Sequence, residues 1–126
     1  MTNERFQEIL RQFQEHQSRT LEVKGKEYSG SKRYQNKLHN FYRMAEAGRK
    51  SPGEALEGVA LKQFVSVQDM IRDMADGEKF SRAYVMEKMG DLCNYFGPLL
   101  LAVMEEEDAI CDPSTTPDTG NPVFGE

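Results

Sequence analysis

The stretch SPGEALEGVALKQFVSVQDM, residues 51–70, carries the clearest local signal in the chain. Ser51 is a good N-cap residue, Pro52 suits the first helical position, and Glu54 is spaced to complete a capping box. Apolar residues then recur at helical spacing until ADGEK, residues 75–79, where the pattern stops. They are Leu56, Val59, Ala60, Phe64, Val67, Met70, Ile71 and Met74. This stretch predicts an amphipathic helix that begins just after Ser51.

Two helices are predicted before this stretch. Apolar residues at three-to-four spacing, from Phe6 to Leu21, indicate a helix over Asn3–Val23. Gly25 and the turn-forming YSGSKR, residues 28–33, predict a loop after it. Apolar and aromatic residues between Tyr34 and Ala45 then indicate a shorter helix, which Gly48 is expected to end in a left-handed conformation.

A fourth helix is predicted after the opening stretch, from Arg82 to Glu106 with Ser81 as its cap. Pro98 lies inside it and removes one backbone hydrogen bond, at a cost of roughly 3 kcal/mol in a regular helix. We therefore expect a kink near Gly97, and a break into two separate helices is the competing interpretation.

Length and composition predict one all-α domain. The chain has 126 residues, 38% hydrophobic and 29% charged, as in helices that each bury a single stripe. From Glu105 to Glu126 there are seven acids and no Lys or Arg. Three prolines and little apolar periodicity follow Met104, so this part cannot offset its ordering entropy. We expect a four-to-five-helix bundle over residues 1–107 and a flexible acidic C-terminal tail over residues 108–126.

The sequence favours a cytoplasmic protein. No run of about 18 apolar residues is present, so no membrane contact is expected, and MTNERFQEIL lacks the pattern of a secretion signal. Two cysteines make neither a disulfide framework nor a zinc motif. We expect Cys93 and most of the seven methionines to fill the core, and His16 and His39 to lie at the surface.

Three polar residues of the predicted fourth helix suggest a binding site for a cation. Glu87, Asp91 and Asn94 stand at i, i+4 and i+7 and therefore share one helix face. Two carboxylates this close favour a cation such as Mg²⁺, which prefers hard oxygen ligands. The alternative is that this face is simply solvated. Eight Lys or Arg against three acids between Leu21 and Lys50 form a basic segment that suits phosphates, although it also suits a solvated loop.

The helix EKMGDLCNYFGPLLLA, residues 87–102, resembles the E-x-x-G-D helix of the MazG-like all-α nucleoside triphosphate pyrophosphatases. The order KGKEYSG, NKLHNF, EALEGVALKQFVSVQDM, EKMGDLCNY also resembles small helical bacteriophage proteins placed near that superfamily, and it covers roughly residues 20–105. The resemblance implies a Mg²⁺-dependent hydrolase that converts a nucleoside triphosphate to a monophosphate and pyrophosphate.

The resemblance also implies roles for particular residues. Glu57, Glu87 and Asp91 would be the metal-binding and catalytic acids. The residues expected to contact the nucleotide, through phosphate charges, base stacking or polar contacts, are Lys24, Lys26, Tyr28, Arg33, Lys62 and Asn94. The chain departs from the family pattern, because its third helix carries fewer glutamates and Lys88 stands where a second glutamate is common.

These departures keep a second function open. The alternative is a non-catalytic phage helical protein that binds a nucleotide or a host protein and thereby regulates or blocks a host pathway. Nucleic-acid binding is disfavoured because the chain lacks a continuous basic face. The resemblance also implies a homo-oligomer, because helical enzymes of the MazG type usually assemble as dimers or tetramers, in which short helix pairs together enclose a substrate.

Overall fold

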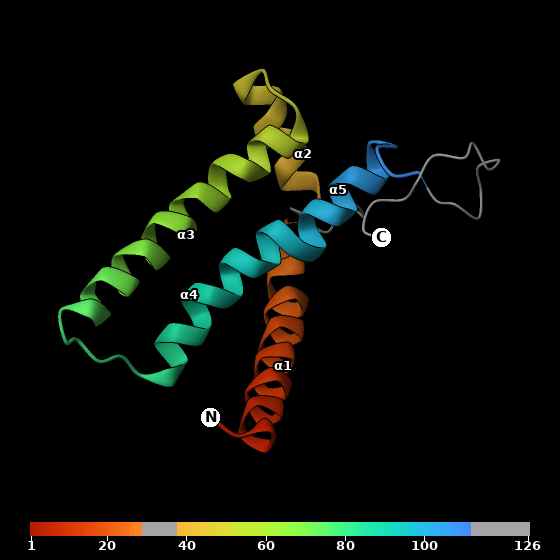
Figure 1. Cartoon of the computed structure of the whole chain (residues 1–126). Coiled ribbons are helices and arrows are strands. Elements are labelled where there is room, and N and C mark those ends of the chain that lie inside the picture. The colour runs from red at the N-terminus through yellow and green to blue at the C-terminus, as the bar shows by residue number, and fades with distance from the viewer. Residues whose placement is uncertain (29–37, 112–126) are drawn as a thin grey trace, which may run out of the picture.

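The computed structural model describes residues 1–28 and 38–111 and confirms the all-α class, because every regular element in these ranges is helical. Its centre is an antiparallel hairpin of α3 (Pro52–Ala75) and α4 (Arg82–Asn94). α1 (Asn3–Tyr28) packs against α4 on the side away from α3, and α2 (His39–Gly48) packs against α3 (Figure 1). The predicted acidic tail lies, from residue 112, outside the described residues.

Both predicted helix starts in the hairpin are confirmed. The Ser51 hydroxyl accepts from the Glu54 backbone N–H at 3.2 Å, and the Glu54 carboxylate accepts from the Ser51 backbone N–H at 2.9 Å. This is the predicted capping box, and it satisfies two of the donors that a helix start leaves unpaired. α3 ends at Ala75, and the turn that follows contains Gly77 with a φ of 96°. α4 then starts with the Ser81 hydroxyl accepting from the Tyr84 N–H at 3.1 Å.

The kink predicted near Gly97 is also confirmed. α4 continues through one wider turn, η1 (Tyr95–Leu99), into α5 (Leu100–Glu106). Gly97 leaves the helical region there, with φ −111° and ψ −109°, and Pro98 follows it. The wider turn makes room for the proline ring, which would otherwise clash with the preceding turn. The helices therefore bend without separating, and α5 packs against α3 (Figure 1).

Two predicted helix ends were wrong. α1 does not stop at Val23 but continues to Tyr28 with Gly25 inside it. A single glycine costs only about 1 kcal/mol in a helix, and good helix formers flank it here. At the end of α2, Gly48 is the last helical residue, and Arg49 takes the left-handed conformation with a φ of 55°. The predicted start of this helix near Tyr34 lies outside the described residues.

The core lies at one end of the molecule, where α2, α3, η1 and α5 meet. Its buried residues are Leu38, Phe41, Leu56, Ala60, Tyr95, Leu99 and Val103. Phe41 and Tyr95 meet edge to face with ring centroids 6.5 Å apart. The kink at Gly97 matters here, because it carries Leu99 and Val103 into this cluster.

Some residues predicted to be buried are exposed. Cys93 is exposed, and so are Met74 and Met89. Met89 borders an open pocket between α1 and α4 that Ile9 and Phe13 also line, so it faces α1 without being enclosed. Cys93 lies on the exposed surface of α4. The prediction was wrong because an apolar side chain on a helix is buried only where a neighbouring helix covers it.

Candidate functional site

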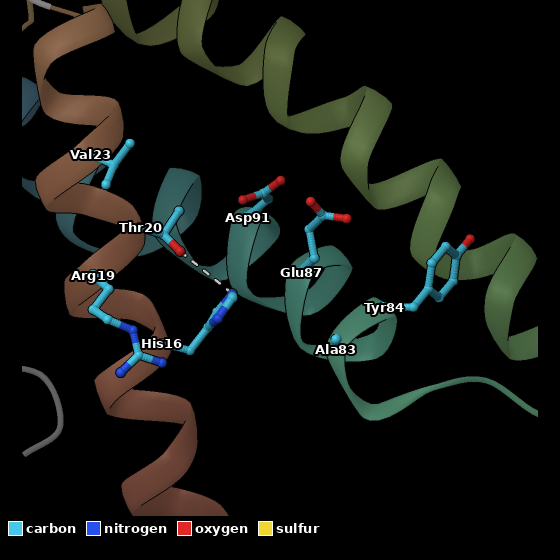
Figure 2. A pocket seen from close by; sticks show the side chains of 8 residues that line it. All are labelled: His16, Arg19, Thr20, Val23, Ala83, Tyr84, Glu87 and Asp91. Carbon is cyan, nitrogen blue, oxygen red and sulfur yellow. Dashed lines mark hydrogen bonds between the residues drawn. The ribbon is translucent and has the colours of Figure 1, made fainter.

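An open pocket of about 770 Å³ lies between α1 and α4 (Figure 2). Its lining residues come in equal number from the two helices: His16, Arg19, Thr20 and Val23 from α1, and Ala83, Tyr84, Glu87 and Asp91 from α4. The pocket therefore combines two acids with a histidine and an arginine. Its size falls within the range usual for small-molecule sites.

A close helix contact holds this pocket together. Gly90 is buried, and a Cβ atom at this position would lie 2.9 Å from Cδ2 of His16. The glycine thus lets the imidazole rest directly on the backbone of α4. One turn further on, the Gln17 side-chain amide donates to Oδ1 of Asn94 at 2.9 Å, and Asn94 is only 3% exposed. The His16–Gly90 contact and the Gln17–Asn94 hydrogen bond together fix how α1 lies along α4.

The acidic side of the pocket is formed by Glu87 and Asp91. They stand one turn apart on α4, and Figure 2 shows both carboxylates on the same flank of that helix. Glu87 is exposed and Asp91 is partly buried. Among the described residues, Glu87 has no hydrogen-bond or ion-pair partner, so its oxygens are available to a ligand.

The basic side of the pocket comes from α1. The His16 ring points from α1 toward α4, and Nε2 of His16 lies 3.5 Å from Oγ1 of Thr20 (Figure 2). Arg19 is exposed, and its guanidinium extends away from the two carboxylates in this view. It makes no ion pair within the described part of the chain. An anionic group entering the pocket would find this guanidinium available for charge-assisted hydrogen bonds.

Tyr84 places an aromatic ring at the pocket beside Glu87. The ring stacks on Phe80 with centroids 5.6 Å apart, and Nζ of Lys88 lies 5.4 Å from the Tyr84 centroid. Both contacts restrict the ring, because Phe80 and Lys88 lie four residues to either side of Tyr84 in sequence. Because Phe80 and Lys88 already pack on this ring, a flat ligand could contact it only where they leave it uncovered.

The structure brings together only part of the predicted site. Glu87 and Asp91 line the pocket as a pair, but Glu57 and Lys62 are exposed on α3 and do not line it. No group of three His, Cys, Asp or Glu residues that could hold a metal ion occurs among residues 1–28 and 38–111. The set of Glu57, Glu87 and Asp91 is therefore not assembled within the single chain as described.

The other predicted nucleotide contacts have different outcomes. Asn94 is buried between the helices with its amide oxygen bonded to Gln17, so it positions α1 and does not face the pocket. Lys24, Lys26 and Tyr28 lie on the last turns of α1, where the side chains are outside the description. Arg33 falls outside the described residues altogether.

Six pocket residues were not assigned to a site from the sequence, and four of them are polar or aromatic: His16, Arg19, Thr20 and Tyr84. His16 was expected at the surface because no second ligand residue stands near it in sequence. The spacing of His16, Arg19 and Thr20, at i, i+3 and i+4, does place them on one helix face. That pattern could have been found, but the helix is so rich in Gln and Glu that it does not stand out.

Comparisons with known proteins assign neither a family nor a function to the chain. No protein-family model matches the chain, and neither the curated proteins nor the solved structures contain a match. Within the described residues, no helix combines the length and the apolar character needed to cross a membrane.

Proposed function

We propose that the pocket between α1 and α4 binds a nucleoside triphosphate with Mg²⁺, and that the protein hydrolyses it to a monophosphate and pyrophosphate. The observation that carries this proposal is the placement of Glu87 and Asp91 in one pocket with His16 and Arg19. Carboxylates suit a metal ion, whereas the arginine and histidine suit phosphate oxygens. The resemblance of the α4 sequence to MazG-like pyrophosphatases supports the same reaction.

The donor set fits Mg²⁺. This ion is commonly held by one or two carboxylates together with waters and substrate phosphates, and it does not need a complete protein cage. Glu87 and Asp91 supply two carboxylates one turn apart. When bound, Mg²⁺ would neutralise part of the triphosphate charge and favour ionisation of a nearby water.

The side chains would divide the remaining work. Arg19 would donate to phosphate oxygens, and His16, anchored on Gly90, would present a ring nitrogen to the same group. Tyr84 would contact the base. Glu87, without a partner among the described residues, would accept a proton from the attacking water. That water would form a bond to the α-phosphorus as the α–β bridging P–O bond breaks and pyrophosphate leaves.

A second function has an observation of its own. The pocket contains two carboxylates, and Lys88 follows Glu87 directly, so the negative charge available to a metal is modest. A protein that binds a nucleotide without hydrolysing it, or that binds a host protein through this region, fits such a site. For both functions we expect a homo-oligomer. The resemblance to bacteriophage proteins would place the activity in the cytoplasm of an infected host.

The decisive experiment combines product analysis with thermal stability. The purified protein is incubated with Mg²⁺ and a panel of ribo- and deoxyribonucleoside triphosphates, and monophosphate and pyrophosphate are quantified. Glu87→Gln and Asp91→Asn should each reduce turnover about 100-fold or more, since general-base and metal contacts contribute on this scale. Asp69→Asn, an exposed acid on α3 outside the pocket, is the matched control and should remain active.

The outcomes separate the two functions. A nucleotide that raises Tm without being turned over would support the non-catalytic alternative, because ligands that bind the folded state stabilise it. Activity that survives Glu87→Gln and Asp91→Asn would place the chemistry outside this pocket. If no nucleotide yields product or raises Tm, both nucleotide proposals fail and a protein partner remains.

A further inference from the structure

α3 carries a second apolar face that nothing in the described chain covers. Its first apolar face is buried in the core through Ala55, Leu56, Ala60 and Met70. On the other face, Leu61, Phe64, Val65 and Ile71 are between 43% and 52% exposed. A helix that is apolar on two sides is typically buried on both. This second face therefore calls for a partner.

The spacing of the exposed face suits another helix. Glu57, Leu61, Phe64, Gln68 and Ile71 follow one another at alternating intervals of four and three residues. Val65 and Arg72, which directly follow Phe64 and Ile71, lie on the same face. Such a heptad-like repeat packs side chains between two helices. From Glu57 to Arg72 this stripe, which we call the α3 stripe, extends about 22 Å along the helix axis.

The charges of the α3 stripe specify an orientation. Glu57 lies at its N-terminal end and Arg72 at its C-terminal end, and both are exposed. Neither forms an ion pair within the described residues. If a second copy of the chain packs antiparallel, Glu57 of one copy meets Arg72 of the other, twice by symmetry. A parallel pair would instead place like charges together.

The same register places the stripe residues of the two copies at matching levels along the helix axes. Pairing Glu57 with Arg72 of the second copy sets Phe64 level with Val65, and Leu61 level with Gln68. The centre of the contact would therefore be mainly apolar, with the charged residues at its two ends.

We propose that the α3 stripe is the interface of a two-fold symmetric homodimer, in which two α3 helices pack antiparallel with Glu57 beside Arg72 of the second copy. The inference does not depend on nucleotide binding or hydrolysis. It also gives Glu57 a role that its exposed position on α3 supports.

Sedimentation velocity over a concentration series tests the interface. The full-length protein should form a dimer. Leu61→Glu should raise the dimer dissociation constant about tenfold or more, because it buries a charge at the centre of the contact. Lys62→Glu is the matched control, since it introduces the same side chain one residue away, off the stripe, and should leave the dimer in place. Circular dichroism confirms that each variant is folded.

A charge exchange tests the antiparallel register. Glu57→Arg gives a chain with two positive stripe ends, and Arg72→Glu gives one with two negative ends. Each variant alone should dimerise about tenfold more weakly, since two surface ion pairs become repulsive. In an equimolar mixture every facing pair is again opposite in charge, so heterodimers should form and be visible by native mass spectrometry.

Three results would overturn the proposal. A wild-type protein that stays monomeric throughout the concentration series excludes the dimer. A dimer unaffected by Leu61→Glu uses another surface. A mixture of the two charge variants that associates no better than either alone excludes the antiparallel register. None of these results bears on turnover, so they are distinguishable from a failure of the proposed hydrolase.

Discussion

At Gly90 the backbone of α4 lies against the imidazole of His16, which leaves little room for a larger residue. A Cβ there would lie 2.9 Å from Cδ2 and 3.1 Å from Nε2 of His16, closer than carbon and nitrogen atoms normally approach. The ring would have to shift, and with it one wall of the pocket. The absence of a side chain at residue 90 therefore shapes the candidate site as much as the charged groups do.

Gly90→Ala is expected to destabilise the fold by about 1–3 kcal/mol, because overpacking outweighs the gain in helix propensity. In a His16→Ala background the clash is absent, so the same substitution should be neutral or stabilising. Gly53→Ala is a control for the backbone effect alone, since a Cβ there meets no atom within 4 Å. Urea denaturation of the four variants and the wild type measures the coupling. Equal effects of Gly90→Ala in both backgrounds would contradict the close contact.

At this scale the sequence predicted the pair of acids but not their surroundings. Glu87 and Asp91 were found because both lie on one short segment, where helical spacing alone places them together. His16 lies more than 70 residues away along the chain, and its approach to Gly90 depends on how α1 packs. Asn94 was assigned to a ligand although it bonds to Gln17, because an amide gives the same local signal in either role.

Among the helices, α3 and α4 offer two N-caps that differ in one respect. Both begin with a serine whose hydroxyl accepts from the backbone N–H three residues later. Only the α3 cap adds an acid, because its third helical residue is Glu54 whereas that of α4 is Tyr84. Hydrogen bonds from the Ser51 backbone and then from its side chain lower the pKa of Glu54 below its usual value of 4.5.

The two caps should therefore respond differently to acid. A carboxyl pKa lowered by folding contributes stability above about pH 4.5, and this contribution is lost as the pH falls through the lowered value. Ser51→Ala should cost about 1 kcal/mol at neutral pH, and the difference from wild type should shrink in acid. Ser81→Ala should cost a similar amount at neutral pH without this acid dependence. Thermal melts of both variants between pH 7 and pH 3 provide the comparison.

If the cost of Ser51→Ala were constant down to pH 3, the Glu54 carboxylate would not be bonded to the Ser51 hydroxyl in solution. Helix starts of this kind were predictable because the capping box lies within four consecutive residues. Helix ends were less so: Gly25 lies inside α1 and Arg49 follows α2 in a left-handed conformation. A single residue such as glycine changes the free energy of extending a helix by only about 1 kcal/mol, and packing contacts easily outweigh that amount.

For the whole molecule, the sequence predicted the fold class and the kink but not the arrangement. Helical periodicity and composition indicate all-α structure, and Pro98 marks the bend because its effect is local. The position of α1 beside α4, away from α3, follows from contacts between distant residues that no local pattern encodes. The same limit explains why Met89 and Cys93 were expected in the core, although both side chains are exposed.

One hydrogen bond joins the two ends of the core region. The Tyr42 hydroxyl on α2 donates to the carboxylate of Glu107, just past α5, at 3.0 Å. Burial, the hydrogen bond to Glu107, and the charges of Glu107 and Glu106 together raise the pKa of Tyr42 to about 12. Each of these causes disfavours the phenolate. The bond therefore depends on the phenol remaining protonated.

Alkaline titration of the folded protein should show one tyrosine that ionises near pH 12, as measured by phenolate absorbance, and Tyr42→Phe should remove it. Since the pKa is raised above its usual value of 10.0, the associated stability is complete below pH 10 and declines as the pH rises toward 12. Glu107→Gln should lower the Tyr42 pKa while leaving it above 10, because burial still acts. Glu105→Gln, which changes a neighbouring acid that does not bond Tyr42, is the control. Circular dichroism over the same pH range must show that the helices remain folded. If Glu107→Gln left the Tyr42 pKa unchanged, the hydrogen bond between α2 and the residue after α5 would not form in solution.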